Sequence, residues 1–182
     1  GGTVGIITPA NSLIGGSAND QIPQRITPLT NGNYVAGSFR FDNPAGPISD
    51  AGSATWCDGT GASVGIVDSL NSLVGTTAND QVGQTIVALT NGNYVVGSPL
   101  WTNPLGPVAS VGAATWGNGV GGTVGNISIS NSLIGSVSGD SVGNGIIAPL
   151  SNGHYVVASS LWDNPSGPRI DAGAATWGDG NT

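Results

Sequence analysis

The sequence contains no lysine, no glutamate and no methionine, and these absences already narrow the fold classes. All three are good helix formers, whereas glycine, which is a poor one, supplies 32 of the 182 residues. The composition therefore disfavours a helical bundle. The only basic side chains are Arg25, Arg40 and Arg169, and the formal net charge is −7 at pH 7. Nucleic-acid binding, which needs clustered cations, is not expected.

Long apolar runs are absent as well, since no stretch approaches the roughly 20 residues that cross a bilayer, and membrane insertion is not expected. Hydrophobic residues still make up 38% of the chain, which is enough for a folded core. The single cysteine, Cys57, excludes an internal disulfide. Glycine occupies its position in the later repeats, so we expect Cys57 to be exposed. Low charge and many small polar residues are typical of a secreted or cell-surface β-protein.

A repeat of about 60 residues fills the chain. Asn-Ser-Leu begins at Asn11, Asn71 and Asn131, and Thr-Trp ends at Trp56, Trp116 and Trp177, with one extra residue in the third copy. The units are 1–62, 63–122 and 123–182. No separate domain or linker remains between them.

Each unit shows the same order of β-type segments. In the second unit, strands are predicted at 63–68, 85–90, 93–98 and 111–116, and Asn71 to Gly75 is predicted as a loop. Asn91-Gly92 lies between two apolar runs and predicts a tight hairpin in which both turn residues have positive φ. No unit contains a run of ten residues with helical spacing.

Four short strands per repeat match a blade of a β-propeller. A β-solenoid needs fewer hairpins, and a β-sandwich does not explain three equal units. The predicted fold is an all-β, propeller-type array of three four-stranded blades. The small residues Gly112, Ala113 and Ala114 suit close packing between sheets, and the tryptophan that ends each unit is expected to seal the seam between blades.

The order of these motifs resembles the FG-GAP repeat of integrin-like β-propellers. Asp80-Gln81-Val82-Gly83, Asn91-Gly92-Asn93 and Val95-Val96-Gly97-Ser98-Pro99 carry the likeness over about half of each unit. The whole unit is also similar to tandem repeats of bacterial filamentous-haemagglutinin-like surface proteins. Many FG-GAP loops bind Ca²⁺, but the loop here is reduced to Asn-Gly without a carboxylate, so no metal site is implied.

Three blades are fewer than the four to eight that close a propeller. The first segment of the chain would then be an unpaired strand, and unpaired edges are templates for pairing. We expect this segment to complete the last blade of another copy, so that two chains form a six-bladed ring, or that successive segments of one long protein do the same. The predicted self-association residues are Thr3, Val4, Gly5, Ile6 and Ile7.

Residues that recur in all units most simply serve the scaffold. Asp20, Asp80 and Asp140 are expected to bind nearby backbone amides, because aspartate in turn-rich loops usually does so. Aromatic rings beside amide and carboxylate groups recur in the loop before the last strand of each unit, where they anchor the loop or stack on a sugar. The candidate sugar-binding residues are Phe41, Asp42, Asn43, Trp101, Asn103, Trp162, Asp163 and Asn164.

No catalytic constellation is recognisable, because His154 has no serine or cysteine partner at motif spacing. The sequence predicts no enzyme, no cofactor and no metal. The expected function is structural assembly and adhesion in a secreted or surface protein, with further copies of the chain as partners. The alternative is a lectin with one shallow site per blade and cell-surface glycans as ligands.

Overall fold

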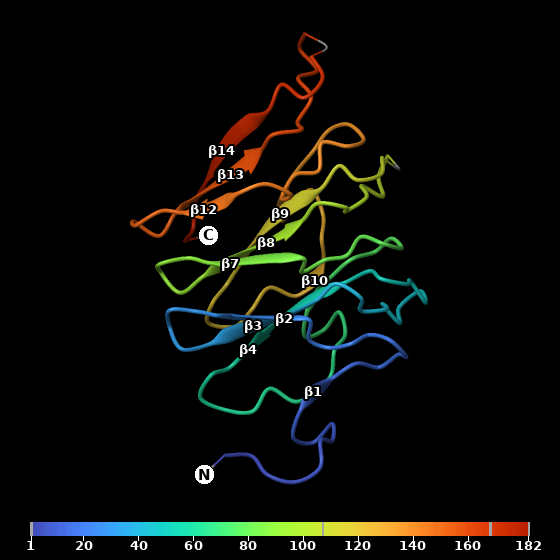
Figure 1. Cartoon of the computed structure of the whole chain (residues 1–182), viewed down its shortest axis with the longest axis vertical. Helices are drawn as coiled ribbons and strands as arrows, with labels where there is room; N and C mark the ends of the chain where they lie inside the picture. The colour runs from blue at the N-terminus through green and yellow to red at the C-terminus, as the bar shows by residue number, and fades with distance from the viewer. Residues whose placement is uncertain (1, 107, 168, 182) are drawn as a thin grey trace.

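The computed structural model describes residues 2–106, 108–167 and 169–181. The regular secondary structure of these residues consists of β-strands, which form four sheets (Figure 1). In the described part of the chain, no helix is long and apolar enough to cross a membrane. The predicted all-β fold of repeated units is therefore confirmed.

Each unit contributes an antiparallel three-stranded meander. The meander strands are β2 (Arg25–Pro28), β3 (Tyr34–Ser38) and β4 (Ser53–Cys57) in the first unit, β7 (Thr85–Ala88), β8 (Tyr94–Ser98) and β9 (Ala113–Gly117) in the second, and β12 (Ile147–Pro149), β13 (Tyr155–Ser159) and β14 (Ala174–Gly178) in the third. In the second unit they lie where strands were predicted at 85–90, 93–98 and 111–116.

The predicted loop that starts with Asn-Ser-Leu contains a short strand instead. β6 (Leu73–Val74) pairs antiparallel with β4, and β11 (Ser132–Ile134) pairs antiparallel with β9, so each meander is extended by the following unit. A hydroxyl pair fixes this contact, with Thr55 Oγ1 and Ser72 Oγ 2.6 Å apart. The prediction of a loop was wrong because two residues are too few to show an alternating pattern.

The first predicted strand of the second and third units is reduced to two residues, which pair in parallel with the short strand of the unit before. β5 (Gly65–Ile66) pairs parallel with β1 (Leu13–Ile14), and β10 (Gly125–Asn126) pairs parallel with β6. The five-stranded sheet, in the order β2-β3-β4-β6-β10, therefore takes its strands from three consecutive units. The remaining sheets, β7-β8-β9-β11, β12-β13-β14 and β1-β5, have four, three and two strands.

The hairpins at Asn-Gly form as predicted, but their turn type differs. Only the glycine has positive φ, at 92° in Gly32, 91° in Gly92 and 91° in Gly153. The N–H of Gly32 donates to the carbonyl of Leu29 at 3.2 Å, and the N–H of Leu29 donates to the carbonyl of Asn33 at 2.8 Å. This is a type I turn followed by a left-handed glycine, a three-residue loop that leaves the asparagine outside the left-handed region.

The meanders follow one another along the long axis of the molecule (Figure 1). The buried side chains lie between them. One buried cluster joins Val35 and Ala54 of the first unit to Ile86 of the second. Glycine permits the close approach, since a Cβ built on Gly37 would lie 2.8 Å from the carbonyl oxygen of Gly83. The described sheets do not close into a ring, and the propeller stays a prediction.

Candidate functional site

A single backbone carbonyl collects three side-chain N–H donors at the junction between the first two units. The oxygen of Gly119 accepts hydrogen bonds from Asn31 Nδ2 at 2.7 Å, Asn33 Nδ2 at 2.8 Å and Trp56 Nε1 at 2.9 Å. All three donors belong to the first unit and the acceptor to the second. The acceptor is main chain, and glycine is required at this position because a Cβ on Gly119 would lie 1.7 Å from the carbonyl oxygen of Gly92.

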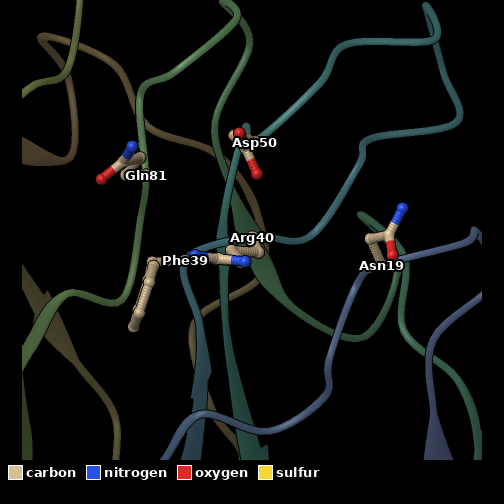
Figure 2. Close-up of a pocket in the computed structure, with 5 residues that line it drawn as sticks. All are labelled: Asn19, Phe39, Arg40, Asp50 and Gln81. Carbon is tan, nitrogen blue, oxygen red and sulfur yellow. The ribbon is translucent and has the colours of Figure 1, made fainter.

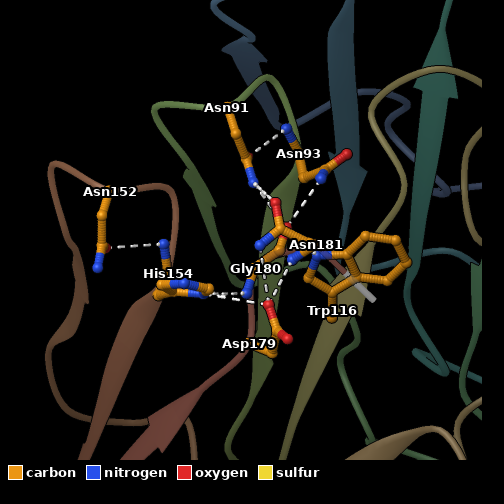
Figure 3. Close-up of polar contacts among 8 residues, drawn as sticks. All are labelled: Asn91, Asn93, Trp116, Asn152, His154, Asp179, Gly180 and Asn181. Carbon is orange, nitrogen blue, oxygen red and sulfur yellow. Dashed lines mark hydrogen bonds and ion pairs between the residues drawn. The ribbon is translucent and has the colours of Figure 1, made fainter.

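The next junction repeats this geometry one period later. The oxygen of Gly180 accepts from Asn91 Nδ2 at 2.8 Å, Asn93 Nδ2 at 2.8 Å and Trp116 Nε1 at 2.9 Å (Figure 3). The predicted role of the repeated tryptophan at the seam between units is therefore confirmed for Trp56 and Trp116. We call this arrangement of two asparagines and one tryptophan on a glycine carbonyl the donor triad.

The third unit carries an unfinished donor triad. Asn152 and Trp177 occupy the positions of Asn91 and Trp116, and the side chain of Trp177 is 57% exposed. His154 replaces the second asparagine. Its Nδ1 lies 3.2 Å from the N–H of Gly180 and 3.1 Å from Asp179 Oδ1, and its ring lies 4.9 Å from that of Trp177. His154 thus accepts the hydrogen bond that Asn93 Oδ1 accepts from Gly119.

Three buried carboxylates tie the loops of each unit together, as the sequence predicted. Asp80 accepts hydrogen bonds from the backbone N–H groups of Thr76, Thr77 and Thr102, all at 2.9 Å. Asp20 and Asp140 occupy the same position and likewise accept from backbone amides. Burial raises the pKa of Asp80, whereas the donated hydrogen bonds outweigh burial at Asp140 and lower its pKa. These aspartates organise the scaffold.

The aromatic residues of the predicted sugar site are mostly inaccessible. The side chains of Phe41 and Trp101 are 1% and 0% exposed, and only Trp162 is half-buried. Phe41 packs against Val67 and Val74 of the second unit. Two of the three rings therefore anchor their loops on the following unit, which was the other interpretation of this pattern, and offer no face to a sugar.

The polar residues beside these rings bind backbone groups of their own loops and, at Asn43, of the following unit. Asn103 and Asn164 each accept a hydrogen bond from a backbone N–H two residues further on, at 3.1 and 3.0 Å. Asp163 accepts from the N–H of Asp171 at 2.8 Å. In the first unit, Asp42 accepts from the N–H of Asp50, and Asn43 donates to the carbonyl of Gly75, both at 2.9 Å. In each unit these residues support the loop that carries them, and the hydrogen bonds do not gather them into one site.

The candidate self-association segment is exposed at the N-terminal end. Val4, Ile6 and Ile7 are 90%, 85% and 77% exposed. Thr3 to Ile7 form no strand here, in contrast to the equivalent residues of β5 and β10.

A pocket of about 560 Å³ at the junction of the first and second units was not predicted (Figure 2). It is lined by Asn19, Phe39, Arg40, Asp50 and Gln81. Leucine replaces Arg40 in the later units, at Leu100 and Leu161, so the pocket is not a repeated feature. Phe39 departs from the repeat as well, with Pro99 and Ser160 at its position in the later units. In the described residues, no cluster of His, Cys, Asp or Glu could hold a metal ion.

Cys57 is buried, and the prediction that it is exposed was wrong. At its position in the later units, a Cβ on Gly117 would lie 2.1 Å from ring atoms of Tyr94. The Tyr94 ring fills this space and is 0% exposed, whereas Tyr34, opposite Cys57, is only half-buried. Burial raises the pKa of Tyr94 to about 12, although the N–H of Thr123 donates to its hydroxyl.

Replacing Gly117 by cysteine should give Tyr94 the half-buried placement of Tyr34. Overpacking of this kind costs about 1–3 kcal/mol of unfolding free energy. The pKa of Tyr94 should fall from about 12 towards its ordinary value. Absorbance of tyrosinate during an alkaline titration measures the pKa, and chemical denaturation measures the free energy.

The reverse substitution, Cys57→Gly, is the matched control, because it removes a side chain at the equivalent position of the first unit. It should lower the pKa of Tyr94 only slightly, because burial is the main cause of the raised value and the charge interaction with Cys57 is a minor one. A Gly117→Cys protein in which one tyrosine still titrates near pH 12 would contradict the proposed competition for space.

A family model of a repeat of unknown function, DUF5650, matches residues 1–24, 28–84, 88–144 and 149–182. The chain belongs to this family. No curated protein matches it. Each inner DUF5650 match begins near the end of the first meander strand and runs past the short strand of the next unit. The two outer matches correspond to the last and first parts of such a repeat.

Proposed function

We propose that the chain is a non-enzymatic module of a secreted or cell-surface protein, and that it builds an extended scaffold for assembly and adhesion. The donor triad is the observation that carries this proposal. It uses side chains of one unit to bind main chain of the next, and it occurs twice in the chain with distances of 2.7–2.9 Å. Such a contact can continue over any number of units, as in other repeat proteins.

Adhesion and extracellular location rest on the sequence alone. The composition is poor in charge and rich in small polar residues, and the units are similar to repeats of bacterial haemagglutinin-like surface proteins. The FG-GAP likeness adds a propeller to the proposal, with further copies of the chain closing the ring. Sheets that stack one after another are compatible with either an open or a closed assembly. The particle shape measured by small-angle scattering distinguishes the open from the closed assembly.

The alternative function, a lectin, retains one accessible ring at Trp162. A glycan array together with an agglutination assay tests the two functions. If the protein is a scaffold, it should bind no glycan on the array. A lectin binds a defined glycan and loses it in Trp162→Ala, a substitution at a half-buried ring that should leave the fold intact. Glycan binding that depends on Trp162 would overturn the proposed function.

A further inference from the structure

Both ends of the molecule carry incomplete versions of the junction that the chain completes inside. We propose that a second copy of this chain docks head to tail, with the N-terminal end of one copy completing the C-terminal sheets of the other. The inference rests on the proposed function, because it names the partner of the assembly surface. It is carried by strand content, by burial and by polar groups.

The strand content of the incomplete sheets is complementary. The complete sheet has a three-stranded meander followed by two short strands, β6 and β10. The C-terminal sheet, β12-β13-β14, is a meander without short strands, and the N-terminal sheet, β1-β5, is two short strands without a meander. Placing β1 of one copy beside β14 of the other produces the full sheet.

The four-stranded sheet lacks one strand that the same docking supplies. Its outer strand is β11, and the equivalent β6 pairs in parallel with β10. Gly5 and Ile6 are the residues of the first unit that correspond to β5. One placement therefore fills both vacant edges, and the two outer family matches together make up about one whole repeat.

The exposure of equivalent side chains differs between the N-terminal end and the interior of the chain. Ile7 is 77% exposed, whereas Val67 and Ile127, one and two periods later, are 0% and 2% exposed. Val67 packs against Phe41 of the preceding unit, and Ile127 shares a cluster with Trp101. In the docked pair Ile7 takes the same place on Trp162, which lines a pocket of about 320 Å³ at the C-terminal end.

Polar groups match in the same register. The unfinished donor triad supplies Trp177 Nε1 and Asn152 Nδ2, and Gly59 occupies the position of Gly119 and Gly180, whose carbonyls accept such donors. The hydroxyl pair of Thr115 and Ser132, 2.7 Å apart, would recur between Thr176 and the second copy's Ser12. The docking surface is therefore continuous with an interface that the chain already contains.

One contact of the docked pair would differ from its counterpart inside the chain, and it would weaken the association between copies. Gly97 lies against Gly143 inside the chain, and a Cβ on Gly97 would be 2.7 Å from the Gly143 carbonyl oxygen. At the ends the corresponding residues are Ala158 and Pro23. Their extra atoms hold the two copies further apart at this point. The association between copies is therefore weaker than the contact between units and is reversible.

Sedimentation velocity over a wide range of concentration tests the proposal on the whole chain. The unmodified protein should form a concentration-dependent series of oligomers. Ile7→Asp and Trp177→Ala each remove one end face and should lower the association constant by roughly tenfold or more. Leu105→Asp, at a residue 78% exposed and away from both ends, is the matched control and should change nothing. Pro23→Gly combined with Ala158→Gly should strengthen association.

A mixture of the Ile7→Asp and Trp177→Ala proteins decides the geometry. Each protein keeps one intact end, so head-to-tail docking predicts a dimer and nothing larger. The proposal is overturned if the unmodified protein and the Pro23→Gly, Ala158→Gly variant both stay monomeric, or if the end variants associate as strongly as Leu105→Asp. If the end variants associate as strongly as the unmodified protein, the docking geometry is wrong but the scaffold function is still supported. Glycan binding that depends on Trp162 would instead reject the scaffold function.

Discussion

Substituting alanine for Gly112 should lower the free energy of unfolding by about 3 kcal/mol, the upper end of the usual cost of overpacking. Gly112 has a φ of 71° and forms a parallel bridge with Val142 of the third unit. A Cβ at Gly112 would lie 2.2 Å from the N and 2.4 Å from the O of Val142. Both atoms are main chain, so no rotamer change relieves the clash and the units must separate.

Gly173 occupies the equivalent position of the third unit and is the matched control. Its φ is 72°, yet a Cβ there meets nothing closer than the carbonyl oxygen of Ser160 at 3.5 Å. Gly173→Ala should therefore cost only the strain of a left-handed alanine, about 1–2 kcal/mol. Urea denaturation at low protein concentration measures both variants. Equal losses at the two positions would mean that backbone conformation, rather than contact between units, dominates at Gly112.

The features that recur in every unit could be predicted from the sequence. The period of the repeat, the positions of the meander strands and the seam tryptophans were all predictable, because each depends on a local pattern that occurs three times. Recurrence separates a residue such as Trp116 from chance similarity. The backbone role of the recurring aspartates was predictable for the same reason, since aspartate in a turn usually binds nearby amides.

What could not be predicted is which unit each short strand joins. Leu73 and Val74 form a strand only because β4 of the preceding unit presents an open edge, and two residues show no alternation of their own. Gly125 and Asn126 pair with β6 of the second unit and so join a sheet whose meander belongs to the first unit. Pairing over such distances depends on how the units stack, which a linear pattern does not encode.

The candidate site shows the same division. Trp101 next to a threonine and an asparagine suits a sugar when read along the chain, but its ring is 0% exposed because the following unit covers it. Cys57 looked exposed because glycine replaces it elsewhere. In the structure, that glycine makes room for a buried tyrosine. The wrong prediction for Cys57, and the open choice at Trp101 between loop anchor and sugar contact, both come from considering a unit without its neighbours.

Asp140→Ala should lower the free energy of unfolding by roughly 3 kcal/mol at neutral pH, because it leaves several backbone N–H groups without an acceptor. Asp140 is 1% exposed. It accepts from the N–H groups of Ser136, Val137 and Asp163 at 2.6, 3.0 and 2.9 Å. Asp68→Ala is the control. Asp68 is only partly buried and caps two amides in a surface turn, so its loss should cost about 1 kcal/mol.

The pH dependence of Asp140→Ala provides a second test with a defined sign. Burial acts to raise the pKa of Asp140, but the hydrogen bonds from Asp163, Val137 and Ser136 together outweigh it, and the pKa is lowered. The folded state then binds the proton less tightly than the unfolded state, whose aspartate titrates at about 3.9. The stabilisation by Asp140 is therefore complete above that pH and is lost as the pH falls through the lowered value. Denaturation curves of the two proteins should converge under acid conditions, and a difference that stays constant with pH would show that the carboxylate charge contributes nothing.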